Sequence, residues 1–237
     1  MSIAENVAAI RAQINEATIA AGRDPKEILL CAATKMNDAD AVRQAIAAGV
    51  DCCGENRVQE LTAKLADNAY AGAPVHFIGH LQTNKVRQVV GKVDLIQSVD
   101  SERLLEAIQK EAARQNTVQD ILLEVNIGGE ESKSGFSLSQ IYGILPKIKD
   151  FSNVRVMGFM AIPPICHFSG ENDKFFQEMY NLSVDITAKK YDNIRVRFLS
   201  MGMSDDFRDA IRCGSNMIRI GTAIFGARDY SNTHKID

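Results

Sequence analysis

The stretch Ile28-Leu29-Leu30-Cys31-Ala32-Ala33-Thr34 is a short, nearly unbroken apolar run, and Lys35 follows it directly. Such a run is typical of a strand that is buried on both faces of a parallel sheet. Residues 38–48 then show a helical pattern that stops at Gly49. This strand followed by a helix is the unit whose repetition predicts the fold.

The same alternation continues along the chain. Strands are predicted at 28–34, 50–54, 75–78, 95–99, 121–125, 154–160, 195–199 and 217–220. Helices are predicted at 38–48, 57–66, 83–90, 101–115, 137–149, 171–189 and 204–212. About eight such units in 237 residues favour a single TIM-like (β/α)8 barrel, with an open doubly wound sheet as the main alternative.

An extra helix precedes the barrel, because Ile3, Val7, Ile10 and Ile14 recur at helical spacing. No Pro-rich or Ser-rich linker divides the chain, so we expect one domain over residues 1–230. We expect the tail at 231–237 to be disordered, because chain ends that nothing ties down rarely fold.

Composition excludes several classes of protein. Charged residues make up 24% of the chain, which argues against disorder, and the net charge of −3 argues against a general nucleic-acid binder. The longest apolar run is far shorter than the roughly 20 residues of a membrane helix. Glu5, Arg11 and Glu16 interrupt the N-terminal segment, so we expect no signal peptide.

The five cysteines are odd in number and contain no C-x-x-C pair. They stand at Cys31, Cys52, Cys53, Cys166 and Cys213. The pattern favours reduced thiols in a cytoplasmic protein over a disulfide or zinc arrangement, and we expect no metal site.

Polar residues gather where the predicted strands end, which is where (β/α)8 barrels carry their active groups. These positions are Lys35, Glu55-Asn56, Gly79-His80, Ser98, Asn126, Met160, Ser200 and Gly221-Thr222. Desolvation at a barrel mouth lowers a lysine pKa, and a neutral amine forms a Schiff base with an aldehyde. The alternative for Lys35 is a side chain that extends from the strand end into water.

Ser200, Gly221 and Thr222 follow the seventh and eighth strands, the usual phosphate-binding corner of such barrels. Ser204, followed by two aspartates, is a candidate N-cap whose helix start would favour an anion. An ordinary capped turn is the alternative.

Arg219 is predicted to face the barrel interior, because Ile218 and Ile220 alternate with it toward the helices. A buried guanidinium requires a partner. That partner is either a ring nitrogen of a ligand or a carboxylate such as Glu124 or Asp94.

An aldehyde, a phosphate and a ring nitrogen together describe pyridoxal 5′-phosphate. The chain also resembles the pyridoxal-phosphate homeostasis protein family over nearly its whole length. The shared segments are ATK at 33–35, GENRVQE at 54–60, HFIGHLQTNK at 76–85, ESKSG at 131–135, MGFM at 157–160, LSMGMSDD at 199–206 and RIGTAIFG at 219–226.

The resemblance implies the barrel of fold-type III pyridoxal-phosphate proteins, shared with the N-terminal domain of alanine racemase. It implies Lys35 as the Schiff-base lysine and Arg219 as the contact to the pyridine nitrogen. It further implies phosphate contacts from Ser200, Gly221 and Thr222, and pocket positions at Asn56, Met203 and Ser204. His80 belongs either at the rim of the site or in a hydrogen bond to backbone.

Two functions are compatible with these residues: a non-catalytic carrier of the cofactor in vitamin B6 homeostasis, and an amino-acid racemase or related enzyme. Racemisation needs an acid/base group on each face of the substrate. We expect the second domain that completes a racemase to be absent and Arg219 to restrain carbanion chemistry, which favours the carrier, with no catalytic residue. We expect a cytoplasmic monomer that delivers the cofactor to apoenzymes and binds neither nucleic acid nor membranes.

Overall fold

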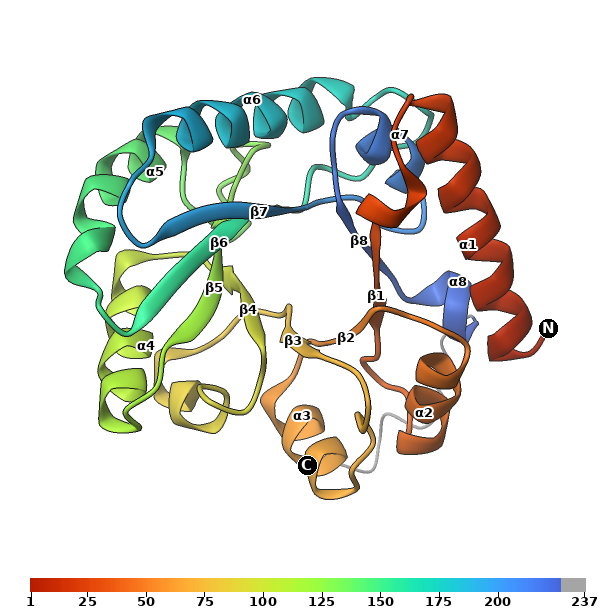
Figure 1. Cartoon of the computed structure of the whole chain (residues 1–237), viewed down its shortest axis with the longest axis horizontal. Helices are drawn as coiled ribbons and strands as arrows, with labels where there is room; N and C mark the ends of the chain where they lie inside the picture. Colours follow the sequence, from red (N-terminus) through yellow and green to blue (C-terminus); the bar gives the residue numbers. More distant parts are fainter. Residues whose placement is uncertain (227–237) are drawn as a thin grey trace.

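The computed structural model describes residues 1–226, which form a closed barrel of eight parallel strands in chain order (Figure 1). The strands are β1 (Leu29–Ala33), β2 (Cys52–Glu55), β3 (Val75–Phe77), β4 (Leu95–Val99), β5 (Gln119–Val125), β6 (Val154–Ala161), β7 (Ile194–Ser200) and β8 (Met217–Ile220). The barrel closes because β8 pairs with β1, with Met217 opposite Leu29 and Arg219 opposite Cys31. The predicted (β/α)8 barrel is therefore confirmed, and the open sheet is excluded.

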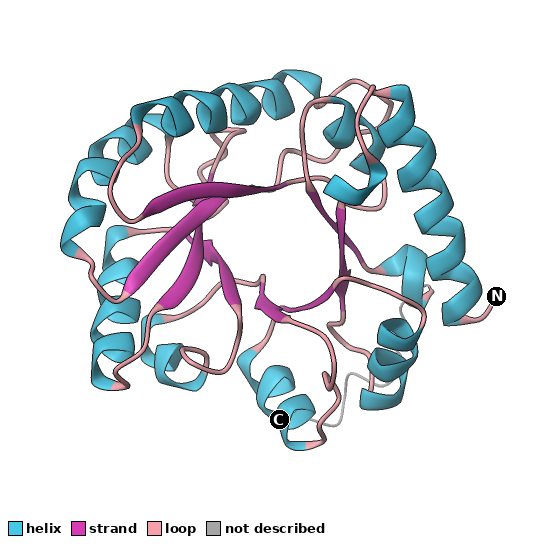
Figure 2. Cartoon of the chain, in the orientation of Figure 1, coloured by secondary structure: helices cyan, strands magenta, loops and turns pink. Residues whose placement is uncertain are grey.

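Helices surround the barrel on the outside (Figure 2). They are α1 (Ile3–Ala20), α2 (Ala39–Ala47), α3 (Val58–Ala66), α4 (Glu102–Arg114), α5 (Leu138–Ile144), α6 (Asp173–Lys189), α7 (Phe207–Arg212) and α8 (Thr222–Phe225). Three 3-10 helices, η1 (Pro25–Glu27), η2 (Thr83–Gln88) and η3 (Leu145–Asp150), complete the described elements. No helix among residues 1–226 is long and apolar enough to cross a membrane.

The predicted extra helix is α1, which begins with a capping box between Ser2 and Glu5. It buries Val7, Ile10 and Ile14, the face that the sequence indicated. The helix packs against α2, α7 and α8, so it covers the outside of the barrel where β8 meets β1 (Figure 1).

The structure differs from the predicted helices at four places. The segment 83–90 forms the 3-10 helix η2, and the predicted helix 137–149 divides into α5 and η3, where Pro146 lacks an N–H for the α-helical ladder. The short helix α8 was not predicted. The predicted tail at 231–237 and the last residues of the predicted domain, 227–230, lie outside the described part of the chain.

The fourth correction concerns the start of α7. This helix begins at Phe207 with Asp206 as its N-cap, so Ser204 is not the cap. The Asp206 carboxylate accepts hydrogen bonds from the backbone N–H of Met203 (2.8 Å) and the side chain of Asn172 (3.1 Å). These bonds fix residues 203–206 as a turn ahead of the helix.

The strands present different chemistry on their two faces. Outward residues such as Leu30, Phe77 and Ile218 pack with the helices in the main hydrophobic core. The barrel interior holds a separate cluster made of Cys31, Cys52, Leu95, Leu122, Met157, Met160 and Met217. Arg219 shares the inward face of β8 with Met217, which confirms the predicted alternation.

Candidate functional site

The predicted cofactor residues lie on one continuous arc of the barrel mouth. They lie at the ends of β1, β2, β7 and β8 or in the loops after them. These four strands are neighbours because β7 pairs with β8, β8 with β1, and β1 with β2. The residues are Lys35, Asn56, Ser200, Met203, Ser204, Arg219, Gly221 and Thr222. The fold therefore brings segments from both ends of the chain to the same edge.

Lys35 is half-buried at the end of β1, and the residue before it is firmly anchored. The Thr34 hydroxyl donates to Glu55 Oε2 (3.0 Å), and Lys64 Nζ donates both to the Thr34 carbonyl (2.7 Å) and to Glu55 Oε2 (2.6 Å). Tyr70 donates to the same carboxylate oxygen (3.2 Å). This buried network on the outer face of the barrel fixes the backbone from which Lys35 extends.

Asn56 carries an unsatisfied polar atom. Its side-chain Oδ1 is buried and has no hydrogen-bond partner among the described residues. Its backbone lies so close to Gly79 that a Cβ on Gly79 would collide with the Asn56 carbonyl. An unsatisfied buried acceptor costs about 1–3 kcal/mol, so its presence at a barrel mouth indicates a ligand that donates a hydrogen bond.

Arg219 is 5% exposed and forms no ion pair among residues 1–226. The Nη1 atom donates to Ser200 Oγ (2.6 Å), and Nη2 donates to the Ala161 carbonyl (2.9 Å). Desolvation lowers the pKa of Arg219, while the charges of Cys31 and Glu124 oppose that shift. A positive charge held inside the barrel by neutral acceptors fits a role in binding a ligand.

The carboxylates considered as partners for Arg219 are engaged elsewhere or lie further away. Asp94 accepts the backbone N–H of Val75 (2.7 Å). Glu124 acts on Arg219 through its charge alone. The structural ion pair is therefore wrong for the described chain.

Ser200 belongs to a hydrogen-bond chain through the barrel interior. Its hydroxyl accepts from Arg219 and donates to Gln97 Oε1 (2.7 Å), and Gln97 Nε2 lies 2.8 Å from His76 Nδ1. A direct contact between this hydroxyl and a phosphate stays a prediction. Gln97 and His76 were not among the predicted site residues, although both follow the inward alternation of their strands.

Cys31 lies on β1 beside Arg219 and is completely buried. Hydrogen bonds from Cys52 and His76, followed by the charges of His76 and Arg219, lower the pKa of Cys31 to about 5. Burial opposes this shift, and the pKa of Cys52 is raised, chiefly by its hydrogen bond with Cys31. Cys31 is therefore the more acidic of the two thiols on the barrel floor.

The predicted phosphate corner is built on close backbone packing. Gly202 has a φ of +95°, and a Cβ there would lie 2.6 Å from that of Ala210. The Gly202 carbonyl accepts the backbone N–H of Arg219 (3.0 Å), which joins the β7 loop to β8. The Met203 N–H is bonded to Asp206, and the N–H groups of Ile224 and Phe225 in α8 donate to the Gly221 carbonyl. A phosphate contact in this corner stays a prediction.

His80 lies at the rim, because its side chain is 60% exposed and bonds to Asp100 rather than to backbone. Asp100 Oδ2 (3.0 Å) and Ser134 Oγ (3.4 Å) both approach His80 Nδ1. A hydrolytic triad uses opposite ring nitrogens, so these three residues do not form one.

Glu124 is a mouth residue that the site prediction missed. Burial, followed by the charge of Asp100, raises the pKa of Glu124 to about 7, while Arg219 and His80 oppose the shift. Its inward position on β5 was available from the alternation of that strand, but its pKa follows from burial that only the folded barrel shows.

A groove of about 450 Å³ lies apart from this mouth, between α6 and β7. Tyr180, Val184 and Phe198 are among its lining residues. None of the predicted cofactor residues lines it, so we do not assign it to the site.

Known proteins resemble this chain over nearly its whole length. The model of the family "Alanine racemase, N-terminal domain" matches residues 3–229. The pyridoxal phosphate homeostasis protein of Aquifex aeolicus is 38% identical over 97% of this chain and 100% of its own length. The protein of that name from Escherichia coli K12 is 37% identical over 97% of this chain and 98% of its own length.

Solved structures agree with the sequence comparison. The Synechococcus elongatus protein PipY, solved with pyridoxal phosphate bound, has a TM-score of 0.82 and 31% identity over 95% of this chain and 100% of PipY. Alanine racemase from Streptomyces coelicolor has a TM-score of 0.69 and 17% identity, and the match covers 96% of this chain and 59% of the racemase. The racemase likeness shows the fold alone.

Proposed function

The chain belongs to the alanine racemase N-terminal domain family, among its pyridoxal phosphate homeostasis proteins, and from that membership we propose that it is a non-catalytic carrier of pyridoxal 5′-phosphate in vitamin B6 homeostasis. The observation that carries the proposal is Arg219, a buried cation at the barrel mouth that is held by neutral acceptors. Asn56 Oδ1 supports it as a buried acceptor without a partner.

The residues present fit this cofactor. Lys35 would provide the amine for its aldehyde, and Arg219 would contact its ring nitrogen. Ser200, Gly221 and Thr222 would hold the phosphate, with Met203 and Ser204 beside them, and Asn56 Oδ1 would accept a hydrogen bond in the same pocket. When bound, the cofactor supplies a reactive aldehyde and an electron-withdrawing ring.

Arg219 also explains why a carrier is favoured over a racemase. A permanent guanidinium charge beside the pyridine nitrogen disfavours protonation of that nitrogen. The ring then withdraws electrons less strongly, which restrains most carbanion chemistry without forbidding racemisation. No residue is assigned a catalytic role.

We also propose that the protein is a monomer in the cytoplasm and delivers the cofactor to apoenzymes that depend on it. The carboxyl ends of the strands meet at one edge of the barrel, so Lys35 and the rim residue His80 face the same mouth. A cofactor released from Lys35 would leave through that mouth.

The test is covalent trapping. The purified protein should be yellow, and borohydride should fix the cofactor on Lys35, located by peptide mapping. Lys35→Ala should abolish both the colour and the adduct. Lys133→Ala should keep them, because Lys133 lies in the loop after β5 and is paired with Glu130 (2.7 Å). An adduct on another lysine in the unmutated protein would overturn the assignment of Lys35.

A further inference from the structure

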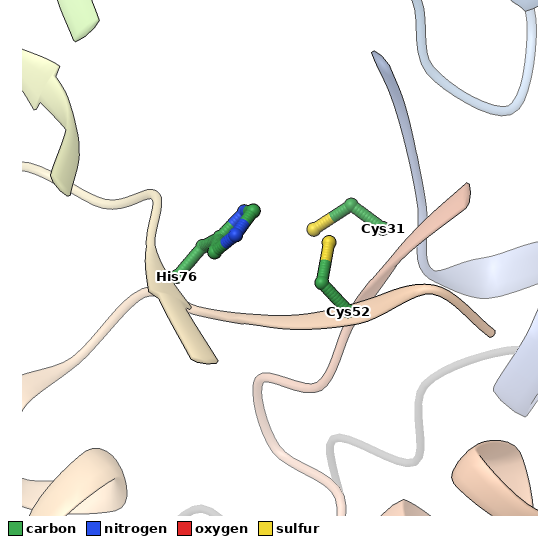
Figure 3. Close-up of side chains that lie close together, drawn as sticks. All are labelled: Cys31, Cys52 and His76. Atoms are coloured by element: carbon green, nitrogen blue, oxygen red, sulfur yellow. The ribbon is translucent and has the colours of Figure 1, made fainter. Parts of the chain in front are cut away.

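Two cysteines and one histidine converge inside the barrel, below the cofactor site. Cys31 on β1, Cys52 on β2 and His76 on β3 are 0%, 2% and 6% exposed. Their sulfur and nitrogen atoms all lie within 4.8 Å of one another. Figure 3 shows both sulfurs and the imidazole directed toward the same space.

The strand register builds this convergence. Cys31 is the direct partner of Cys52 across the β1–β2 pair, and His76 is registered opposite Gly54 on the next pair. Gly54 stands on the same inward face as Cys52, and a Cβ there would lie 2.9 Å from Cys31 Sγ. A side chain at Gly54 would therefore crowd the space between Cys31 and the end of β3.

The surroundings of this cluster are rich in sulfur. Five of the seven residues in the interior cluster are cysteine or methionine, and the methionines are Met157, Met160 and Met217. Thiolates and thioethers are soft ligands, which prefer soft metal ions over magnesium, calcium or manganese.

We propose that Cys31, Cys52 and His76 form a binding site for a soft monovalent metal ion, copper(I), inside the barrel. Zinc prefers four ligands in a tetrahedron, whereas the described residues supply three in a place that water reaches poorly. Copper(I) accepts three ligands and is softer than zinc.

The charges of the two thiolates and of Arg219 also favour copper(I) over zinc. Two thiolates and one copper(I) carry a net charge of −1, and the buried Arg219 guanidinium opposite Cys31 carries +1. A zinc ion with the same thiolates would be neutral and would leave the Arg219 charge without a counterion. An unbalanced buried charge is costly.

Ligation changes no oxidation state. The ion forms bonds to Cys31 Sγ, Cys52 Sγ and one imidazole nitrogen, and any proton still on either sulfur passes to solvent. The Gln97 amide Nε2 lies 2.8 Å from His76 Nδ1 and can only donate there, so the neutral imidazole carries its proton on Nε2. For Nε2 to bind the ion, that proton moves to Nδ1, and the Gln97 amide turns so that its Oε1 accepts from Nδ1–H and orients the ring.

The test is a competition titration of the reduced, full-length protein with copper(I) under nitrogen, against the chromophoric chelator bicinchoninate. We expect one tightly bound copper(I) per chain. Cys31→Ala and Cys52→Ala should each weaken binding by at least about 100-fold, the upper end of what even an outer-shell change costs. Cys53→Ala is the matched control, because Cys53 is the next residue on β2 but packs outward in the main core. It should change the affinity by less than threefold.

X-ray absorption on the unmutated copper-loaded protein tests the site without relying on a variant that folds. We expect two sulfur ligands and one nitrogen ligand, and the nitrogen should disappear in His76→Phe. Absence of copper(I) binding, binding that survives Cys52→Ala, or a higher affinity for zinc(II) than for copper(I) would each overturn the proposal.

Discussion

Ser200 shows how one side chain connects the candidate site to the barrel interior. Its hydroxyl is completely buried between the Arg219 guanidinium and the Gln97 amide. Removing it leaves one charged N–H donor inside the barrel without an acceptor, which is a larger penalty than losing a bond between neutral groups. If Arg219 contacts the cofactor as proposed, Ser200 would affect binding through the position of Arg219 as well as through any contact with the phosphate.

We expect Ser200→Ala to weaken cofactor binding by about 0.5–1.5 kcal/mol, or up to about 3 kcal/mol because the lost bond involves a charge. Equilibrium titration with pyridoxal 5′-phosphate and with unphosphorylated pyridoxal distinguishes the two roles. A loss that is equal for both compounds assigns Ser200 to Arg219, and a loss confined to the phosphate ester assigns it to the phosphate. Ser98→Ala is the control, since that buried hydroxyl donates to the Gly79 carbonyl instead.

Glu124 makes stability depend on pH. Its pKa rises to about 7 in the folded protein, above the ordinary value of 4.5, so the folded state holds its proton after the unfolded state has released it. Stability therefore falls as pH rises from about 4.5 to about 7 and then stays level. Glu124→Gln should be more stable than the unmutated protein at pH 8, by about 1–3 kcal/mol, with little difference at pH 4.5.

Urea unfolding at both pH values measures this difference. Glu131→Gln, at an exposed position in the loop after β5, should change stability equally at the two pH values. A Glu124→Gln difference that is the same at pH 4.5 and pH 8 would contradict the assignment of a raised pKa to Glu124.

At the scale of elements, the loop between β7 and α7 depends on a single backbone conformation. Gly202 has a φ of +95°, and an added Cβ would lie 2.6 Å from Ala210 Cβ and 3.0 Å from Phe207 Cα. Gly202→Ala should destabilise the protein by about 1–3 kcal/mol and weaken cofactor binding, because the loop must shift to relieve this contact. Urea unfolding and cofactor titration measure the two effects.

Gly143→Ala is the matched control for that substitution. Gly143 lies in α5, and a Cβ there meets nothing within 4 Å. Alanine in a helix is favoured over glycine, so this variant should be stabilised by about 0.5–1 kcal/mol. Equal destabilisation of the two variants would remove the special role of Gly202.

The elements were predicted well where periodicity alone decides them. All eight strands and α1 follow from apolar runs and helical spacing, because a parallel barrel buries both faces of each strand. The error at the α5–η3 junction arises from Pro146, and the error at α7 arises from local hydrogen bonds. Asp206 is an example, because its bond to the Met203 N–H delays the helix by three residues from the predicted start at 204.

At the scale of the whole molecule, the mouth was easier to predict than the interior. Strand ends are visible in the sequence, so Lys35, Asn56 and Gly221 could be assigned to one edge. A series of hydrogen bonds links Arg219, Ser200, Gln97 and His76, and its two ends, His76 and Arg219, are 143 positions apart in the sequence. These bonds depend on the closure and register of the barrel. The alternation of residues along one strand does not show which residues of other strands will be its hydrogen-bond partners.

A carrier and an enzyme differ in whether the barrel mouth holds a second acid/base group opposite Lys35. Lys35 follows β1, whereas Glu124 lies on β5, across the barrel, and the pKa of Glu124 is raised to about 7 in the folded protein. If the carrier assignment holds, Glu124 does not act as a second acid/base group. Exchange of the α-proton of L-amino acids in deuterated water, followed by NMR, should then stay within about tenfold of the rate with free cofactor. A positioned acid or base contributes about 10²–10⁴-fold. Exchange thousands of times above the free-cofactor rate, abolished by Lys35→Ala and reduced by Glu124→Gln, would make the protein an enzyme, with Glu124 serving the face opposite the lysine.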